Sequence, residues 1–94
     1  MKTIAVLGAT GSVGLQAIDV ARARGYKIDF ISAGSNCAFA ERIARALMPT
    51  AVAMADVRAA NELRFRLRDT SVKVLSGEGG ICEGIGQSKA DTVV

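Results

Sequence analysis

Three features of the sequence predict an α/β domain with a parallel, Rossmann-like sheet between layers of helices. Short apolar runs alternate with helical stretches along the chain, which is the β-α-β order of a doubly wound fold. Gly8, Gly11 and Gly14 lie between the first apolar run and the first helical stretch. The chain has 94 residues, 50% of them hydrophobic, which suits one small domain and leaves no room for a second core.

The first third of the chain predicts one β-α-β unit. Thr3–Leu7 is a short apolar run that ends in a glycine loop, as a strand would. Val13–Arg24 carries its apolar residues on one helical face, and Gly25 follows where glycine commonly ends helices. Lys27–Ala33 predicts the second strand, and residues 34–36 form a tight loop after it.

The middle of the chain continues the alternation. Cys37–Leu47 predicts a second helix, which Pro49 stops. Thr50–Met54 predicts the third strand and Val57–Arg68 the third helix. Asp56 precedes that helix, so its carboxylate is expected to cap the first turn, with a place in an adenine pocket as the alternative.

The last third is less regular. Val72–Leu75 is a short extended stretch, and Gly77–Gly86 is a glycine-rich segment that could form a weak helical turn. We interpret residues 77–80 within it as a surface connection, because their likeness to a phosphate loop is only superficial. Asp91–Val94 predicts a fourth main strand beside the first, in the order 3-2-1-4. Since a chain rarely stops on a central strand, we expect residues 1–94 to be the N-terminal part of a longer enzyme.

The glycine loop predicts a cradle for the phosphates of a dinucleotide. Glycines between a strand and a helix let main-chain N–H groups approach a phosphate, and the helix directs its positive end to the same place. Thr10 and Ser12 add hydroxyl groups that can cap the helix, contact the pyrophosphate, or do both. Leu15 and Gln16 stand where an ATP-type loop would have Lys and Ser or Thr. The alternative is that the glycines only permit close packing, a role we expect for Gly14 in any case.

The end of the second predicted strand favours NADP over NAD. An NAD site places Asp or Glu there to bind the ribose 2′-hydroxyl, whereas this chain continues with Gly34, Ser35 and Asn36. The nearest acid, Asp29, is expected at the opposite end of the sheet. Ser35, Asn36 and the N–H groups of the next helix can instead donate to a 2′-phosphate, although helix capping by either residue would explain them too. No arginine stands in this loop, and Arg42 lies more than a helical turn away.

The sequence shows no catalytic set or metal site. It contains no histidine, and Cys37 and Cys82 lie far apart, without the spacing of metal ligands. We interpret both cysteines as reduced, buried or half-buried small side chains. We therefore expect no catalytic and no metal-binding residue within this chain.

Composition argues against binding to nucleic acids or membranes. The net charge is +3, and the arginines alternate with acids and apolar residues instead of forming a basic stripe. Aromatic residues make up 4% of the chain and do not cluster into a stacking platform for bases. No apolar run approaches the roughly 18–20 residues of a membrane span, and the start does not resemble a secretory signal, so we expect a cytoplasmic protein.

Several blocks of the sequence, in their order and spacing, resemble the N-terminal domain of 1-deoxy-D-xylulose 5-phosphate reductoisomerases. The similarity runs along all 94 residues, and the opening glycine loop combined with the later Ala-Gly-Ser-Asn is its most specific part. The blocks are residues 4–14, 19–20, 32–36, 74–78 and 90–94.

The resemblance implies an NADPH-dependent enzyme of non-mevalonate isoprenoid biosynthesis. Such enzymes rearrange and reduce 1-deoxy-D-xylulose 5-phosphate to 2-C-methyl-D-erythritol 4-phosphate with Mg²⁺, Mn²⁺ or Co²⁺, and a homodimer is expected. The metal ligands and the substrate-phosphate site would lie beyond Val94, so this chain alone should be inactive. Some members have lysine where Ser35 stands, which implies a weaker charge pairing here. By motif and resemblance together, the candidate cofactor-binding residues are Gly8, Thr10, Gly11, Ser12, Val13, Gly14, Gly34, Ser35 and Asn36.

Two alternatives remain open at this stage. Another NADP-dependent reductase, such as a semialdehyde dehydrogenase, could share the glycine loop, although Cys37 and Cys82 are not placed as its reactive cysteine. A nucleotide-binding or interaction module without chemistry would explain the short length, although an unpaired edge at Val93 and Val94 argues against it.

Overall fold

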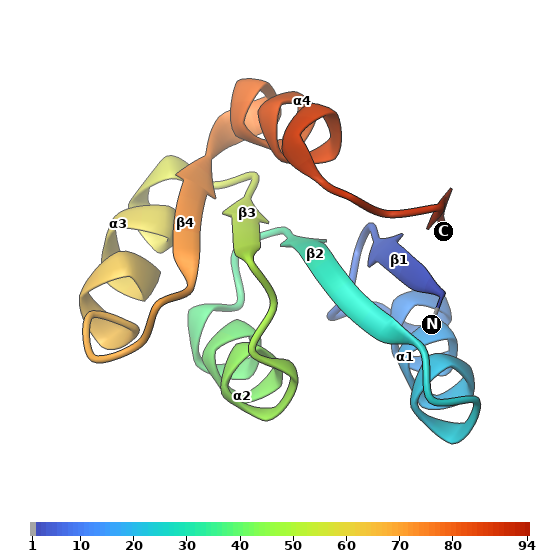
Figure 1. Cartoon of the computed structure of the whole chain (residues 1–94). Helices are drawn as coiled ribbons and strands as arrows, with labels where there is room; N and C mark the ends of the chain where they lie inside the picture. The colour runs from blue at the N-terminus through green and yellow to red at the C-terminus, as the bar shows by residue number, and fades with distance from the viewer. Residues whose placement is uncertain (1) are drawn as a thin grey trace.

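The computed structural model describes residues 2–94 and shows five strands alternating with four helices (Figure 1). Short apolar runs become strands and amphipathic stretches become helices, as the periodicity predicts. Among the described residues, no helix is long and apolar enough to cross a membrane. The elements are β1 Thr3–Val6, α1 Ser12–Ala23, β2 Lys27–Ala33, α2 Cys37–Leu47, β3 Ala51–Met54, α3 Val57–Arg66, β4 Lys73–Ser76, α4 Gly77–Gln87 and β5 Thr92–Val93.

All five strands are parallel and lie in the order β4-β3-β2-β1-β5. The predicted α/β fold is confirmed, and the predicted order 3-2-1-4 appears as β3-β2-β1-β5. The difference is one additional strand. The extended stretch after α3 pairs with β3, in the register Val52 with Val74 and Ala53 with Leu75, and extends the sheet beyond its predicted edge.

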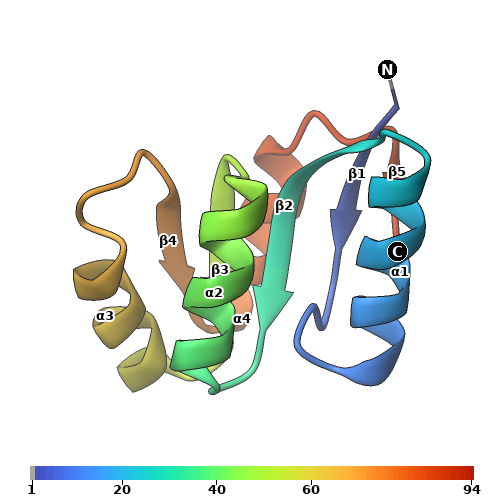
Figure 2. The ribbon, with the colours of Figure 1, turned by 90° about the horizontal axis from the view of Figure 1, so that it is seen from below.

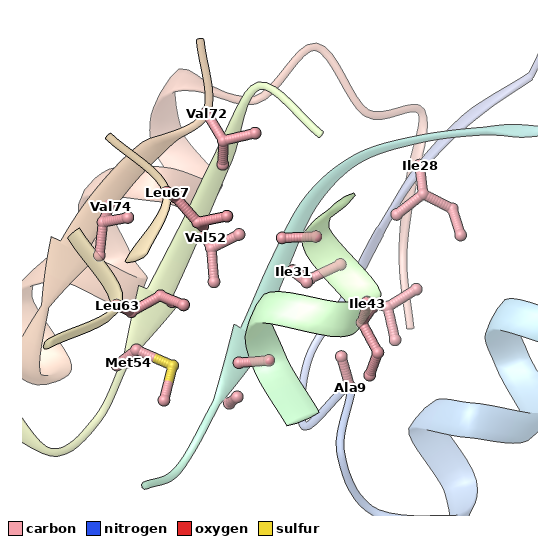
Figure 3. Packing of buried hydrophobic residues seen from close by; sticks show 14 of the residues in the cluster. Ala9, Ile28, Ile31, Ile43, Val52, Met54, Leu63, Leu67, Val72 and Val74 are labelled. Atoms are coloured by element: carbon pink, nitrogen blue, oxygen red, sulfur yellow. The ribbon is translucent and has the colours of Figure 1, made fainter. Parts of the chain in front are cut away.

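Helices cover both faces of the sheet, with α1, α2 and α3 on one face and α4 on the other (Figures 1 and 2). Alternate residues of each strand point to opposite faces, so Ile31 packs under α1–α3 while its neighbour Phe30 faces α4. The larger apolar cluster lies under the three helices and includes Val52, Met54 and Leu63 (Figure 3). Both faces being covered explains the continuous burial along β2.

Interpreting residues 77–80 as a surface connection was wrong, because they begin helix α4, which continues to Gln87 and is longer than the weak turn expected. Two of its glycines, Gly80 and Gly84, serve close packing. A methyl group at Gly84 would lie 2.1 Å from Cε1 of Phe30, and one at Gly80 would lie 3.0 Å from Cβ of Leu75. These two glycines are four residues apart and therefore share the helix face that meets the sheet. Glycine is a poor helix former, but a larger residue at Gly84 would prevent α4 from lying this close to Phe30.

The buried carboxylate of Asp29 holds the segment after α4 against the sheet. Its oxygens accept hydrogen bonds from Oγ1 of Thr50 at 2.6 Å, Oγ of Ser88 at 3.0 Å and the N–H of Lys89 at 3.2 Å. Burial favours a higher pKa for Asp29, but the hydrogen bonds from Thr50, Lys89 and Ser88, with the charge of Lys27, outweigh it and lower the pKa. This contact directs the chain from α4 back across the sheet toward β5.

The packing of α4 can be tested at two glycines of the same helix. Gly84→Ala should lower the free energy of unfolding by about 1–3 kcal/mol, because its methyl group would overlap the Phe30 ring. Gly86→Ala is the matched control: a methyl group there meets nothing within 4 Å, and alanine should raise helix stability by about 0.5–1 kcal/mol. Urea denaturation followed by circular dichroism gives both values. Equal effects of the two substitutions would contradict the close contact with Phe30.

The Asp29 contacts predict a pH dependence of stability. A carboxyl whose pKa is lowered by folding stabilises the protein above its unfolded pKa, about 3.9, and loses that contribution as pH falls through the folded value. Asp29→Asn should therefore be less stable than the unchanged protein at pH 7, and the difference should shrink below about pH 4. Urea denaturation at pH 7, 5 and 3.5 measures this. A difference that stays constant across this range would show that the charge of Asp29 does not contribute.

Candidate functional site

The candidate site lies at the carboxyl edge of the sheet, where β1 meets its two neighbours. The chain runs from β1 outward through β2 and β3 to β4, and then returns to β5 on the other side of β1. Such a reversal of strand order leaves a crevice outside the strand ends, where open α/β sheets bind ligands. The loops that follow β1 and β2 lie at this edge, and together with the first turn of α1 they carry all the predicted site residues.

The loop after β1 is a tight turn that only glycine permits at two positions. Gly8 has φ +66°, a left-handed conformation that residues with a Cβ rarely adopt. At Gly14 a methyl group would lie 2.1 Å from the carbonyl oxygen of Gly8. The first turn of α1 therefore packs directly against the end of β1, which confirms the packing role expected of Gly14. At Gly11, in contrast, a methyl group would make only an ordinary 3.5 Å contact with the same oxygen.

Ser32 on β2 holds this turn in place and was not identified from the sequence. Its hydroxyl accepts a hydrogen bond from the N–H of Gly8 at 3.0 Å, and its carbonyl accepts one from the N–H of Ala9 at 2.7 Å. The Ser32 side chain is buried, so the hydroxyl is directed into the fold. Its partner is 24 residues distant in sequence. The sequence held no local signal for this contact, because β2 also contains the polar residues Lys27 and Asp29.

The first turn of α1 presents unpaired main-chain donors. Gly11 occupies the N-cap position and no side chain caps the helix, so of the roles left open for Thr10 and Ser12 the structure does not show capping. Within residues 2–94, the N–H groups of Ser12, Val13 and Gly14 have no hydrogen-bond partner. Uncapped N–H groups at the positive end of a helix are suited to binding an anion.

The loop after β2 lies at the same edge. Gly34, Ser35 and Asn36 are exposed, and Asn36 accepts the N–H of Phe39 at 3.1 Å, which confirms it as the N-cap of α2. The N–H groups of Cys37 and Ala38 have no partner among the described residues. The structure thus places the two predicted groups of residues on adjacent loops.

Acidic residues near this edge are occupied or distant. Asp29 lies in the first half of β2, toward the opposite edge of the sheet, as predicted. Its carboxylate accepts a hydrogen bond there from Thr50. Asp56 donates its N–H to the carbonyl of Gly34 at 3.1 Å and caps α3 by accepting the N–H of Ala59 at 3.0 Å, which confirms the expected cap. No carboxylate follows β2 within residues 34–36, where an NAD site would place one.

The cysteines are both free but differ in setting. Cys37 is buried at the start of α2, and burial together with the neighbouring Glu62 raises the pKa of its thiol to about 11. The thiol is therefore protonated at neutral pH and is a poor nucleophile. Cys82 is exposed on α4, contrary to the expected burial. In the described part of the chain, no three His, Cys, Asp or Glu side chains gather as a metal site would require.

A glycine turn and an uncapped helix at the point where the strand order reverses are typical of a Rossmann-like, nucleotide-binding domain. The family model described as 1-deoxy-D-xylulose 5-phosphate reductoisomerase matches residues 4–94. This chain therefore belongs to the 1-deoxy-D-xylulose 5-phosphate reductoisomerase family. The match confirms the resemblance inferred from the sequence and does not favour a semialdehyde dehydrogenase or a module without chemistry.

Curated relatives carry the same name. The reductoisomerase of Acetivibrio thermocellus is 44% identical over 78 residues, which is 83% of this chain and 20% of the relative. That of Ruminiclostridium cellulolyticum is 34% identical over 93 residues, or 99% of this chain and 24% of the relative. The chain thus spans about a fifth to a quarter of the length of these relatives.

Solved structures of the family share the fold. A DOX-P reductoisomerase in complex with NADPH, fosmidomycin and magnesium superposes with a TM-score of 0.90 at 25% identity, covering 99% of this chain and 24% of that one. The reductoisomerase of Zymomonas mobilis in complex with NADPH gives 0.89 at 26% identity, with 98% and 25% covered.

The role of Ser32 predicts a specific loss in the glycine turn. Ser32→Ala should lower the free energy of unfolding by about 1–3 kcal/mol, because the N–H of Gly8 loses its partner in a partly buried place. Ser35→Ala is the matched control, since that exposed side chain makes no hydrogen bond within the described structure, and should change stability by less than about 0.5 kcal/mol. Hydrogen exchange should show faster exchange of the Gly8 amide in Ser32→Ala only. An unchanged Gly8 amide would show that Ser32 does not hold the turn.

Proposed function

We propose that residues 1–94 are an NADPH-binding domain and form the N-terminal part of a reductoisomerase. The enzyme would convert 1-deoxy-D-xylulose 5-phosphate to 2-C-methyl-D-erythritol 4-phosphate, as the family does. Bound NADPH would supply the hydride for the reduction. The chain's own residues would bind and orient the dinucleotide.

The observation that carries this proposal is the set of free N–H groups on Ser12, Val13 and Gly14. They lie at the positive end of α1, behind a turn that Gly8 and Gly14 make possible. In the proposal this group, with Thr10 and Gly11, binds the pyrophosphate. The close packing at Gly14 does not compete with this role, because the N–H groups of Ser12, Val13 and Gly14 have no partner among the described residues.

The loop after β2 would bind the adenosine end of the cofactor. Gly34, Ser35 and Asn36 are exposed beside the free N–H groups that open α2. Without a carboxylate in residues 34–36, the loop does not repel a 2′-phosphate. This supports NADPH over NADH as the cofactor.

We assign the remaining functions to the rest of the enzyme. The substrate, the divalent cation and the contacts of a homodimer would belong to the three quarters or more of the family's length that this chain does not span. The proposal includes a cytoplasmic location and no binding to nucleic acid or membrane. Paired surface charges support the expectation that the chain does not bind nucleic acid. Arg45 and Arg66, for example, pair with acids of α2, α3 and the segment after α3.

Calorimetric titration of the 94-residue chain with NADPH and NADH tests the proposal. NADPH should bind more tightly than NADH, and Gly11→Ala should weaken NADPH binding about tenfold or more, or roughly 1.4 kcal/mol. The methyl group would stand where the main chain must approach a phosphate, while meeting only the carbonyl oxygen of Gly8 at 3.5 Å within the protein.

Gly86→Ala serves as the control for this titration, since it adds the same methyl group on α4 in open space. It should leave NADPH binding unchanged. Circular dichroism establishes that each variant is folded. A folded, unchanged chain that binds neither nucleotide would contradict the proposal.

A further inference from the structure

We infer that Arg42 is the residue that makes the site specific for a 2′-phosphorylated dinucleotide. This inference rests on the proposed function and deepens it. The loop after β2 supplies neutral donors, Ser35 and Asn36, but no positive charge. Arg42, on the second turn of α2, supplies the charge from outside the loop.

Arg42 and the loop share one hollow at the carboxyl edge. A depression of about 270 Å³ is lined by Asn36, Ala38, Phe39 and Arg42. The hollow therefore lies between Asn36, the N-cap residue of α2, and the side chain of Arg42. The free N–H groups of Cys37 and Ala38 open at the same helix end. A phosphate in this hollow would meet main-chain donors and a permanent positive charge together.

The reach of arginine suits this position. Arg42 follows the N-cap by six residues, or about 9 Å along the helix axis at roughly 1.5 Å per residue. Helical side chains lean back toward the N-terminus, and an extended arginine spans most of this distance. Arg42 can thus act at the helix end although it is not part of the loop.

Arg42 is available, whereas its neighbour on the same helix is not. Arg42 is exposed and makes no hydrogen bond or ion pair within residues 2–94. Arg45 bonds Glu41 at 3.0 Å and Asp69 at 2.9 Å. Arg42 and Arg45 are three residues apart, but only Arg45 takes part in the contacts with α3 and the segment after it.

No acid binds Arg42 in the described part of the chain, and this includes the carboxylates of Asp19 and Asp56. Asp19 of α1 lines the groove on the other side of Arg42, but no ion pair joins them among the described residues. Asp56 is tied to the Gly34 carbonyl through its N–H and caps Ala59 with its carboxylate. The guanidinium therefore keeps its charge uncompensated at the edge where the phosphate would bind.

The test compares ligands that differ only in the 2′-phosphate. The 94-residue chain and its Arg42→Gln variant are titrated with 2′,5′-ADP and 5′-AMP, and with NADPH and NADH. Arg42→Gln should weaken binding of 2′,5′-ADP and NADPH about tenfold and leave 5′-AMP and NADH unchanged. Arg42→Lys should retain part of the preference, because lysine keeps the charge but not the fork of donors.

Arg24→Gln is the matched control, since it removes an equally exposed and unpaired arginine at the far end of α1. It should weaken no ligand selectively, which separates a local contact from the net charge. An undiminished preference for 2′-phosphorylated ligands in Arg42→Gln, with NADPH still bound, would overturn the assignment of Arg42 alone. A folded wild-type chain that binds none of the four ligands would overturn the proposed function and, with it, this assignment.

Discussion

The contact between the first turn of α1 and the end of β1 determines the geometry of the whole carboxyl edge. A methyl group at Gly14 would overlap the carbonyl oxygen of Gly8 at 2.1 Å, so the helix can lie this close only with glycine there. The left-handed backbone of Gly8 turns the chain sharply enough to begin α1 at once. Ser32 fixes the same turn from the neighbouring strand. Together these contacts direct the N–H groups of α1 over the strand ends.

The three helices on that face begin in different ways: side chains cap α2 and α3 but not α1. Asn36 and Asp56 cap α2 and α3 with their own side chains, so those helix starts are partly satisfied within the protein. Gly11 leaves α1 without any such cap. An unsatisfied helix start costs stability unless water or a ligand supplies the acceptors. In the proposed function, the pyrophosphate of the cofactor would supply the acceptors that the start of α1 lacks.

The sequence predicted the elements from β1 to α3 within a few residues, because apolar runs and glycine or proline punctuation mark each boundary. It predicted both site loops for the same reason. It failed where a residue's role depends on a distant partner. In the sequence, Gly80 and Gly84 are typical of a loop. Only their close contacts with Leu75 and Phe30 explain why a helix has glycine at these positions. Ser32 has no local pattern at all, since its partner, Gly8, is 24 residues away.

Helical periodicity explains how α2 can serve both packing and binding. Glu41 and Arg45 are four residues apart and share the face toward α3, where Arg66 and Asp69 complete a charge network. Hydrogen bonds from Arg45 and then Arg66 lower the pKa of Glu41, so the acid stays charged and the network stays neutralised. Arg42 follows Glu41 by one position, a rotation of about 100° that carries it off this face. The same helix therefore uses Arg45 in the charge network, while Arg42 stays unpaired among the described residues and is available for the proposed contact with a phosphate.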